Sequence, residues 1–315
     1  MSIRLLFFPL ALSVSCAAAE LPVRDLNPLI SGYELPPSLP SEAPDSSALL
    51  TQFATGNISL VQLNTTESVQ LDAELQRWQI GFTKPLGNNW NLRLELPYLR
   101  IYGGQLDRSI ESWHHTFGLP NGNRDSINRN QLLVQYAQHG ITGYRLAQPE
   151  NSIGDATLRI GHALGANTAR HTMFWLSIKF ATGNTEKLTG SGAADVALSI
   201  SSSQSLTSHV IANSQLSLSI LGNGDRLTEQ QRAIAWSGAL GVNVRLSSHW
   251  YTAIQLDGHS KVFNSDLRAL GNVVQLSLGP RYQSRNWQTS LLLSEDIAVD
   301  TAPDVQFQLN IARNF

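Results

Sequence analysis

Cysteine, charge and long apolar runs are all scarce in this sequence. Cys16 is the single cysteine among 315 residues, and it lies in an N-terminal stretch that we expect to be removed, so disulfides play no part in the mature chain. Charged residues make up only 15% of the chain, against about 25% in soluble domains. The formal net charge of −2 gives no indication of a nucleic-acid partner. No run of 18 apolar residues follows residue 20, which excludes membrane-spanning helices.

The first residues have the pattern of a secretory signal peptide. Arg4 precedes an apolar run from Leu5 to Val14, and the small residues Ala17–Ala19 follow it. We therefore expect a signal peptide over residues 1–19, cleaved after Ala19. Lipidation at Cys16 is the rival interpretation, but Ser13 stands three places before it, where a larger aliphatic residue is usual.

Apolar and polar residues alternate along most of the remaining chain. In the stretch from residue 90 to residue 98, one face carries Trp90, Leu92, Leu94, Leu96 and Tyr98, and the other carries Asn91, Arg93 and Glu95. This period of two is typical of strands with one face in hydrocarbon. It predicts about twelve strands, near residues 48–62, 68–84, 89–103, 153–165, 170–182, 192–206, 208–221, 232–247, 250–263, 270–284, 287–299 and 302–315.

The expected connections alternate between short turns and longer loops, as in bacterial outer-membrane barrels with an even number of strands. Hydrocarbon tolerates no unpaired backbone groups, so the sheet must close. We expect an all-β transmembrane antiparallel barrel over residues 48–315 in the outer membrane of a Gram-negative cell. Residues 20–47 would form a periplasmic N-terminal segment, and residues 104–152 one long extracellular loop.

Three further features bear on the barrel. Trp90, Trp250 and Trp287 each open a strand on its apolar parity, as expected of an aromatic girdle in the membrane. Phe315, after apolar residues of one parity, resembles the C-terminal signal read by the barrel-assembly machinery, although Arg313 departs from that pattern. In the second strand the apolar parity switches, which predicts a β-bulge near Arg77.

The polar parity predicts the residues that line the lumen. They are Asp72, Glu74, Arg93, Glu95, Asp155, Arg159, Lys179, Asp195, Arg245, Asp257, Lys261 and Arg281. Charges of both signs are compatible with a salt-bridged filling that keeps the barrel rigid, and also with a charged pore lining. Their balance argues against strong ion selectivity in either case.

The long loop is richer in apolar residues than a disordered segment. Leu106, Ile110, Trp113 and Phe117 follow helical spacing, and Asp107 suits the positive N-terminal end of a helix. We expect a short amphipathic helix that folds over or into the barrel mouth, and a hairpin over residues 131–146. The expected mouth residues are Asp107, Ile110, Trp113, His114, Phe117 and Arg124.

This loop also carries a family resemblance. Its motif residues are Gly103, Gly104, Asp107, Ile110, Trp113, His114, Phe117, Gly118, Leu119, Pro120 and Arg124, with Gly154-Asp155 and Asn27-Pro28-Leu29 elsewhere. These resemble a family of proteobacterial outer-membrane barrels that is classified only as a domain of unknown function. The resemblance covers nearly the whole mature chain, and it implies a barrel fold and no established activity.

Catalytic and metal-binding patterns are weak. Adjacent histidines such as His114 and His115 diverge by about 100° on a helix, and His259 and Ser260 face opposite sides of a strand. The sequence contains no phosphate-binding glycine loop, CxxC or HExxH motif. We expect no catalytic residues, no metal and no cofactor.

These patterns favour a porin-like channel for small solutes, hydrophobic ones included, rather than an enzyme. The alternative is a structural or partner-binding barrel with a plugged lumen, and an outer-membrane lipid hydrolase ranks third. The expected partners are outer-membrane lipid, the barrel-assembly machinery and a small-molecule solute.

Overall fold

The computed structural model describes residues 21–118, 129–165, 170–298 and 300–315, without the side chains of residues 113, 114 and 117. The expected signal peptide over residues 1–19 and Arg124 of the long loop therefore lie outside the described residues. Within the described stretches, no helix has the length and apolar character needed to cross a membrane.

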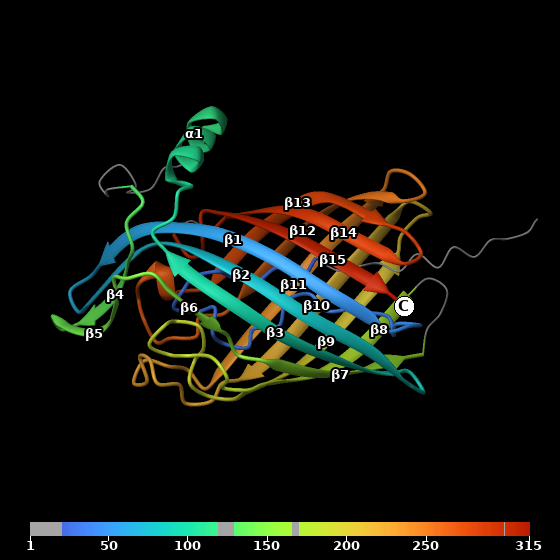
Figure 1. The fold of residues 1–315 in the computed structure, drawn as a ribbon, viewed down its shortest axis with the longest axis horizontal. Coiled ribbons are helices and arrows are strands. Elements are labelled where there is room, and N and C mark those ends of the chain that lie inside the picture. Colours follow the sequence, from blue (N-terminus) through green and yellow to red (C-terminus); the bar gives the residue numbers. More distant parts are fainter. Residues whose placement is uncertain (1–20, 119–128, 166–169, 299) are drawn as a thin grey trace, which may run out of the picture.

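Twelve antiparallel strands of the described chain close into a barrel, as the alternation predicts (Figure 1). Strand β1 pairs with both β2 and β15, which closes the ring. Around the ring the strands are β1 (Ala48–Leu63), β2 (Glu67–Gly87), β3 (Trp90–Tyr102), β7 (Thr157–Leu164), β8 (Arg170–Lys179), β9 (Asp195–Ser205), β10 (Val210–Ile220), β11 (Ile234–Arg245), β12 (Trp250–His259), β13 (Val273–Gln283), β14 (Trp287–Asp296) and β15 (Val305–Asn314).

Between β3 and β7 the described part of the chain forms one helix and three further strands. They include helix α1 (Asp107–Phe117) and the expected hairpin, formed by β4 (Leu133–Gln138) and β5 (Ile141–Leu146). Strand β4 extends the sheet beside β2, and the short β6 (Glu150–Ile153) pairs with the second half of β3. We call this end of the barrel the long-loop end, and the end where β1 starts and β15 finishes the short-turn end.

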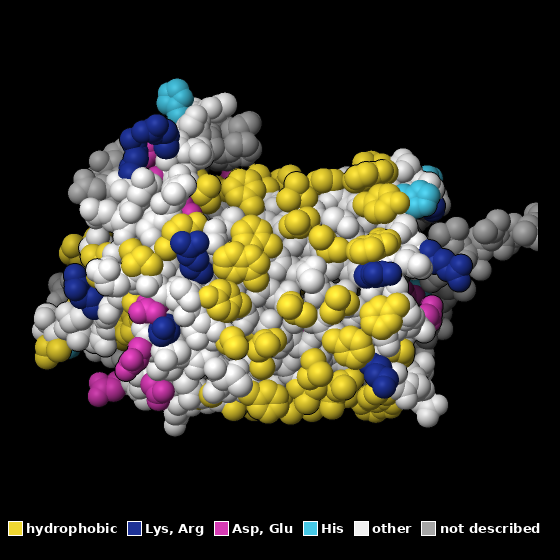
Figure 2. All heavy atoms as spheres, viewed as in Figure 1, with side chains coloured by type: hydrophobic (Ala, Val, Ile, Leu, Met, Phe, Trp, Pro, Cys, Tyr) yellow, Lys and Arg dark blue, Asp and Glu magenta, His cyan; other side chains and the backbone are white. Residues whose placement is uncertain are grey.

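The outer wall carries an apolar belt (Figure 2). Outward side chains such as Leu198, Leu216 and Leu240 are at least 60% exposed, which suits a surface in hydrocarbon rather than in water. Trp90, Trp250 and Trp287 are exposed at the short-turn end of β3, β12 and β14. The guanidinium of Arg313 lies over the ring of Trp287, 5.3 Å from its centroid, so this departure from the apolar pattern is accommodated by a cation–π contact.

The bulge predicted near Arg77 is wrong. Strand β2 pairs with β1 in one unbroken register from Ser68 to Thr83, and its irregularity lies at Pro85–Gly87 instead. The apolar parity switches because the surroundings change along the strand. The inward residues of β2 near the long-loop end are apolar, since they pack on other parts of the chain inside the barrel.

Residues 21–47 lie inside the barrel, so their expected position as a periplasmic lead-in is also wrong. The inward side chain of Gln255 donates to the carbonyl of Leu21 (2.8 Å), and Trp175 Nε1 donates to that of Pro40 (2.8 Å). At the turn between these points, the amide of Asn27 donates to the carbonyl of Ala269 (2.9 Å). The segment runs to the long-loop end and returns to the short-turn end, where β1 begins. We call residues 21–47 the lumen segment.

The proline-rich part of the lumen segment suits this position. Proline has no backbone N–H but keeps its carbonyl acceptor. The carbonyl of Pro37 accepts from Gln215 Nε2 at 2.7 Å, and that of Pro36 accepts from the same amide and from the hydroxyl of Ser237. The polar wall therefore supplies donors to a backbone that needs few acceptors in return.

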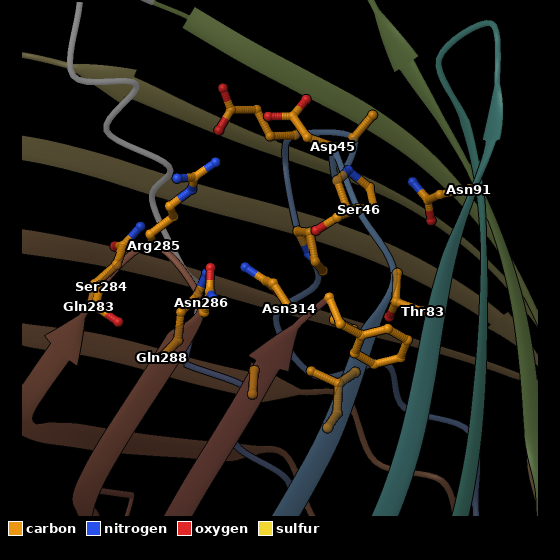
Figure 3. A pocket seen from close by; sticks show the side chains of 18 of the residues that line it. Asp45, Ser46, Thr83, Asn91, Gln283, Ser284, Arg285, Asn286, Gln288 and Asn314 are labelled. Carbon is orange, nitrogen blue, oxygen red and sulfur yellow. The ribbon is translucent and has the colours of Figure 1, made fainter. Parts of the chain in front are cut away.

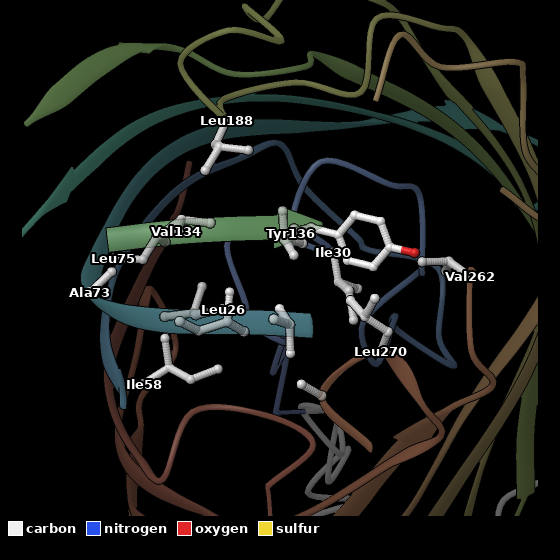
Figure 4. Close-up of a cluster of buried hydrophobic side chains, with 14 of the residues drawn as sticks. Leu26, Ile30, Ile58, Ala73, Leu75, Val134, Tyr136, Leu188, Val262 and Leu270 are labelled. Carbon is white, nitrogen blue, oxygen red and sulfur yellow. The ribbon is translucent and has the colours of Figure 1, made fainter. Parts of the chain in front are cut away.

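The long-loop end of the lumen is filled by a buried apolar cluster, which we call the cap cluster (Figure 4). The lumen segment contributes Leu26, Leu29, Ile30 and Tyr33, and Tyr33 packs edge-on against Phe263 at 5.6 Å. The wall and the loops contribute the rest, including Ile58, Leu71, Leu75, Val134, Tyr136, Leu188, Val262 and Leu270. The structure is therefore closed at this end.

Candidate functional site in the lumen

An arginine–glutamate network joins the lumen segment to the wall. Arg159 on β7 is fully buried and pairs with Glu34 of the lumen segment (2.6 Å) and with Glu95 on β3. Arg93 Nε donates to the other oxygen of Glu95 at 2.7 Å, and Arg24 lies 3.5 Å from Glu34. Ion pairs of this kind are costly to bury unless each charge is well paired, so the segment and the wall depend on each other here.

A further guanidinium lies beside this network without a carboxylate of its own. Arg77 is 6% exposed and donates to Gln79 at 2.6 Å, and its Nε has no hydrogen-bond partner in the described chain. It is close enough to Arg24, Arg159, Glu34 and Glu95 to interact electrostatically with all four. The group thus holds four guanidinium groups and two carboxylates, an excess of two positive charges. We call Arg77, Arg93 and Arg159 the wall arginines.

A second buried cation is fully paired. Lys179 Nζ contacts Asp155 (2.6 Å) and Asp195 (3.3 Å), and it also donates to the hydroxyl of Ser191 (2.7 Å). Asp195 in turn accepts the backbone N–H of Glu34 at 2.9 Å. This group anchors the lumen segment next to the arginine network.

Two histidines on the wall also contact carboxylates of the lumen segment. His259 Nε2 lies 3.2 Å from Asp25, and His171 Nδ1 lies 2.8 Å from Glu42. Burial raises the pKa of the Glu42 carboxyl, and the nearby His171 opposes that shift. The segment is therefore held to the wall by polar and charged contacts along its length, as well as by the cap cluster.

The short-turn end of the lumen is open. A cavity of about 850 Å³ lies there, lined in part by the last residues of the lumen segment (Figure 3). All of the side chains labelled in the figure are polar or charged, among them Asp45, Asn91, Arg285, Gln288 and Asn314. A smaller cavity of about 130 Å³ continues inward from Arg93 to Arg281, between Pro22 and the wall. Both cavities are lined by polar and apolar side chains, and both reach Arg93 of the arginine network.

The wall behind the segment carries polar groups that the protein does not satisfy. The inward side chains of Asn213, Asn243, Gln275 and Gln306 are at most 8% exposed. Each has at least one nitrogen or oxygen without a hydrogen-bond partner in the described chain. Such groups cost about 1–3 kcal/mol each when they are buried permanently. A wall built around a fixed core would be expected to carry apolar residues at these positions.

The structure brings most of the predicted lumen residues inside. Two of them lie near the ends of the barrel. Arg245 donates to the carbonyl of Ser247 near the short-turn end, and Lys261 donates to that of Ser265 near the long-loop end. Those on the inner face or directed into it are Arg93, Glu95, Asp155, Arg159, Lys179, Asp195, Asp257 and Arg281.

Asp72 and Glu74 were assigned to the lumen wrongly. Both have the parity of the outward residues Trp78 and Ile80. They are nevertheless buried, and Glu74 accepts hydrogen bonds from the Tyr102 hydroxyl and the backbone N–H of Gln105, both at 2.7 Å. In this part of β2 the outer face is polar and the inner face is apolar. This is the reverse of the pattern from which the lumen residues were predicted. Without these two acids, the predicted wall residues comprise four acidic and six basic side chains.

Helix α1 lies outside the wall, so the expectation that it folds over or into the mouth is wrong (Figure 1). The carboxylate of Asp107 accepts from the outward amide of Asn57 at 2.9 Å and from the backbone N–H of Asn130 at 2.7 Å. Ile110 is buried on this side. Gly104 has a φ of +74°, and a side chain there would collide with the Glu74 carboxylate, so glycine is required at this position.

Metal-binding and Ser/His hydrolase chemistry gain no support from the described residues. Among them, no group of three or more His, Cys, Asp or Glu side chains could hold a metal ion. His259 is directed to Asp25, whereas the Ser260 hydroxyl accepts from the backbone N–H of Trp236. The side chain of His114 is outside the described set, so its contribution stays a prediction.

A family model described as "Protein of unknown function (DUF3187)" matches residues 13–315. The chain belongs to this family. The resemblance inferred from the long-loop motif is thereby confirmed. Among proteins with curated descriptions, none matches the sequence.

One solved structure shows the same fold. The "COG4313 outer membrane channel from Pseudomonas putida F1" has a TM-score of 0.56 at 11% identity, covering 86% of this chain and 96% of that one. The NanC porin (TM-score 0.46, 8% identity, 86% and 99% coverage) and the Ralstonia pickettii toluene transporter TbuX (0.42, 8%, 86% and 90%) are less similar. The first comparison confirms that this chain folds as an outer-membrane β-barrel.

Proposed function

We propose that this barrel is a channel for small solutes whose lumen is closed by the lumen segment. The observation that carries the proposal is the unsatisfied polar wall behind that segment, including Asn243, Gln275 and Gln306. These side chains would line an aqueous path once the segment moved. The cavity of about 850 Å³ at the short-turn end already forms part of such a path, and outer-membrane barrels place short turns on the periplasmic side.

Similarity to one solved channel supports the same proposal. The protein of Pseudomonas putida is named an outer membrane channel. The wall arginines and the cap cluster together would suit solutes that have both a charged and an apolar part.

A plugged barrel that never opens is the second candidate. The cap cluster favours it, because Leu26, Leu29, Ile30 and Tyr33 of the lumen segment are each at most 2% exposed. Removing these side chains from their contacts would cost about 1.5–3 kcal/mol apiece if they were left in water.

Conductance in planar lipid bilayers separates the two candidates. We expect intermittent openings from the mature protein, and steady conductance when residues 22–43 are replaced by a Gly/Ser linker of equal length. Both proteins must first show the change in gel mobility on boiling that marks a folded barrel. If neither folded protein conducts, the result would contradict the proposed channel and support a permanent plug.

We further propose that residues 1–19 form a signal peptide that is removed during export. Support comes from Arg4, the apolar run and Ala17–Ala19. The mass of the protein purified from outer membranes should correspond to a chain that begins at Glu20. A retained N-terminus, or a mass showing lipid on Cys16, would contradict this.

A further inference from the structure

The lumen segment places a carboxylate on a wall that carries excess positive charge. Glu34 is 1% exposed, and its two oxygens contact Arg159 at 2.6 Å and Arg24 at 3.5 Å. If the segment left the lumen, Arg24 and Glu34 would leave together. The wall would then keep Arg77, Arg93 and Arg159 against Glu95 alone, with the same excess of two positive charges.

These positive charges are arranged to receive an anion. Arg93 and Arg159 are direct cross-strand partners on β3 and β7, and like charges in that arrangement repel unless an anion lies between them. The carboxylate of Glu95 is one such anion, since it contacts both Arg93 and Arg159. Arg77 adds a third guanidinium, whose Nε has no hydrogen-bond partner in the described chain.

From this geometry we infer that the wall arginines form a binding site for small organic carboxylates, and that Glu34 occupies it as a built-in stand-in for the solute. Guanidinium groups bind planar carboxylates through paired charge-assisted hydrogen bonds. The inference deepens the proposed channel function, on which its biological meaning rests, by naming a class of solute.

The neighbours of Glu34 indicate the kind of carboxylate. Tyr33 belongs to the cap cluster and Leu35 packs against it, so the chain places apolar groups on both sides of the acid. A solute that copied this arrangement would join a carboxylate to an aromatic or aliphatic body. The route to the site passes Arg281 and Arg93 in the smaller cavity, both of which favour anions.

Equilibrium binding tests the inference without requiring an open channel. The probe is benzoate, with neutral benzamide as its matched control, added to the folded mature protein in detergent and chloride-free buffer. Because Glu34→Gln removes the built-in competitor, we expect it to bind benzoate about tenfold more tightly than the wild type, the effect of one charge-assisted contact. Arg77→Gln should weaken benzoate binding about tenfold relative to the wild type, and benzamide should respond to neither change.

A second carboxylate of the same segment provides the control variant. Glu42→Gln removes the contact with His171 and none with the arginines, so it loosens the segment without freeing the site. Benzoate affinity should then stay at the wild-type value. Equal gains in Glu34→Gln and Glu42→Gln, equal binding of benzamide, or unchanged affinity in Arg77→Gln would each overturn the inference. If benzoate binds as expected but the protein never conducts, the channel proposal is contradicted and the inferred binding site still stands.

Discussion

A disulfide between positions 41 and 203 is expected to abolish conductance through the barrel. The hydroxyl groups of Ser41 in the lumen segment and Ser203 on β9 lie 2.9 Å apart, and both residues are buried. In the variant Ser41→Cys with Ser203→Cys, oxidation would fix the segment to the wall, so openings that need it to move should disappear. Reduction should restore them. The mature sequence contains no other cysteine if Cys16 is removed with the signal peptide.

The wall itself supplies a control with the same chemistry. Ser277 on β13 and Ser294 on β14 have their hydroxyl groups 2.7 Å apart. A disulfide in the variant Ser277→Cys with Ser294→Cys joins two strands that are already paired and does not touch the lumen segment. It should leave the openings unchanged. If openings continue with the 41–203 disulfide shown to be formed, the solute path does not depend on the segment and the proposed gate is wrong.

Replacing Arg159 by methionine is expected to cause the largest loss of stability. The change leaves the carboxylates of Glu34 and Glu95 buried together without the cation that they share. Removing one partner of a buried ion pair costs about 3–5 kcal/mol. Arg159→Met should lower the urea midpoint at which the folded, heat-modifiable band disappears from gels. Combining it with Glu34→Gln should recover part of the loss, because one of the two carboxylates that lose Arg159 is then neutral.

Arg245→Met is the matched comparison. It removes the same charge from the inner face of the barrel, but Arg245 is only partly buried and donates to the Ser247 carbonyl near the short-turn end. Its effect should stay within about 0.5 kcal/mol, as for surface substitutions in general. Similar losses in both variants would mean that the arginine network does not hold the lumen segment.

The sequence predicts the barrel well because the residue pattern of each strand depends on the surroundings of its two faces. Strands such as β3 and β12 face hydrocarbon on one side and polar groups on the other, so period-two alternation identifies them without any tertiary information. The hairpin of β4 and β5 could be found in the same way. Arg93, Glu95 and Arg159 were assigned correctly to the lumen, because a charge on the opposite parity would face lipid.

The prediction failed where a second layer of the chain covers the wall. Residues 104–107 bury Glu74 on the outer face, and the lumen segment buries Leu71 and Leu75 on the inner face. Parity alone cannot separate these positions from their opposites. The location of residues 21–47 was missed for a related reason. Their prolines exclude a paired strand but do not show which side of the wall the segment lies on, and the inward amide of Gln215 was not recognised as its donor.

The closed ring around the lumen segment also restricts the order of assembly. The register between β1 and β15 runs for ten residue pairs and joins the first strand of the barrel to the last. A chain cannot pass sideways through a hydrogen-bonded wall. The lumen segment, which directly precedes β1, must therefore either thread in through an open end or already be in position when the last strand meets the first. In the second case the growing sheet would wrap around the segment, and the network of Glu34, Arg159 and Glu95 would serve as a template for curvature before it served as a closure.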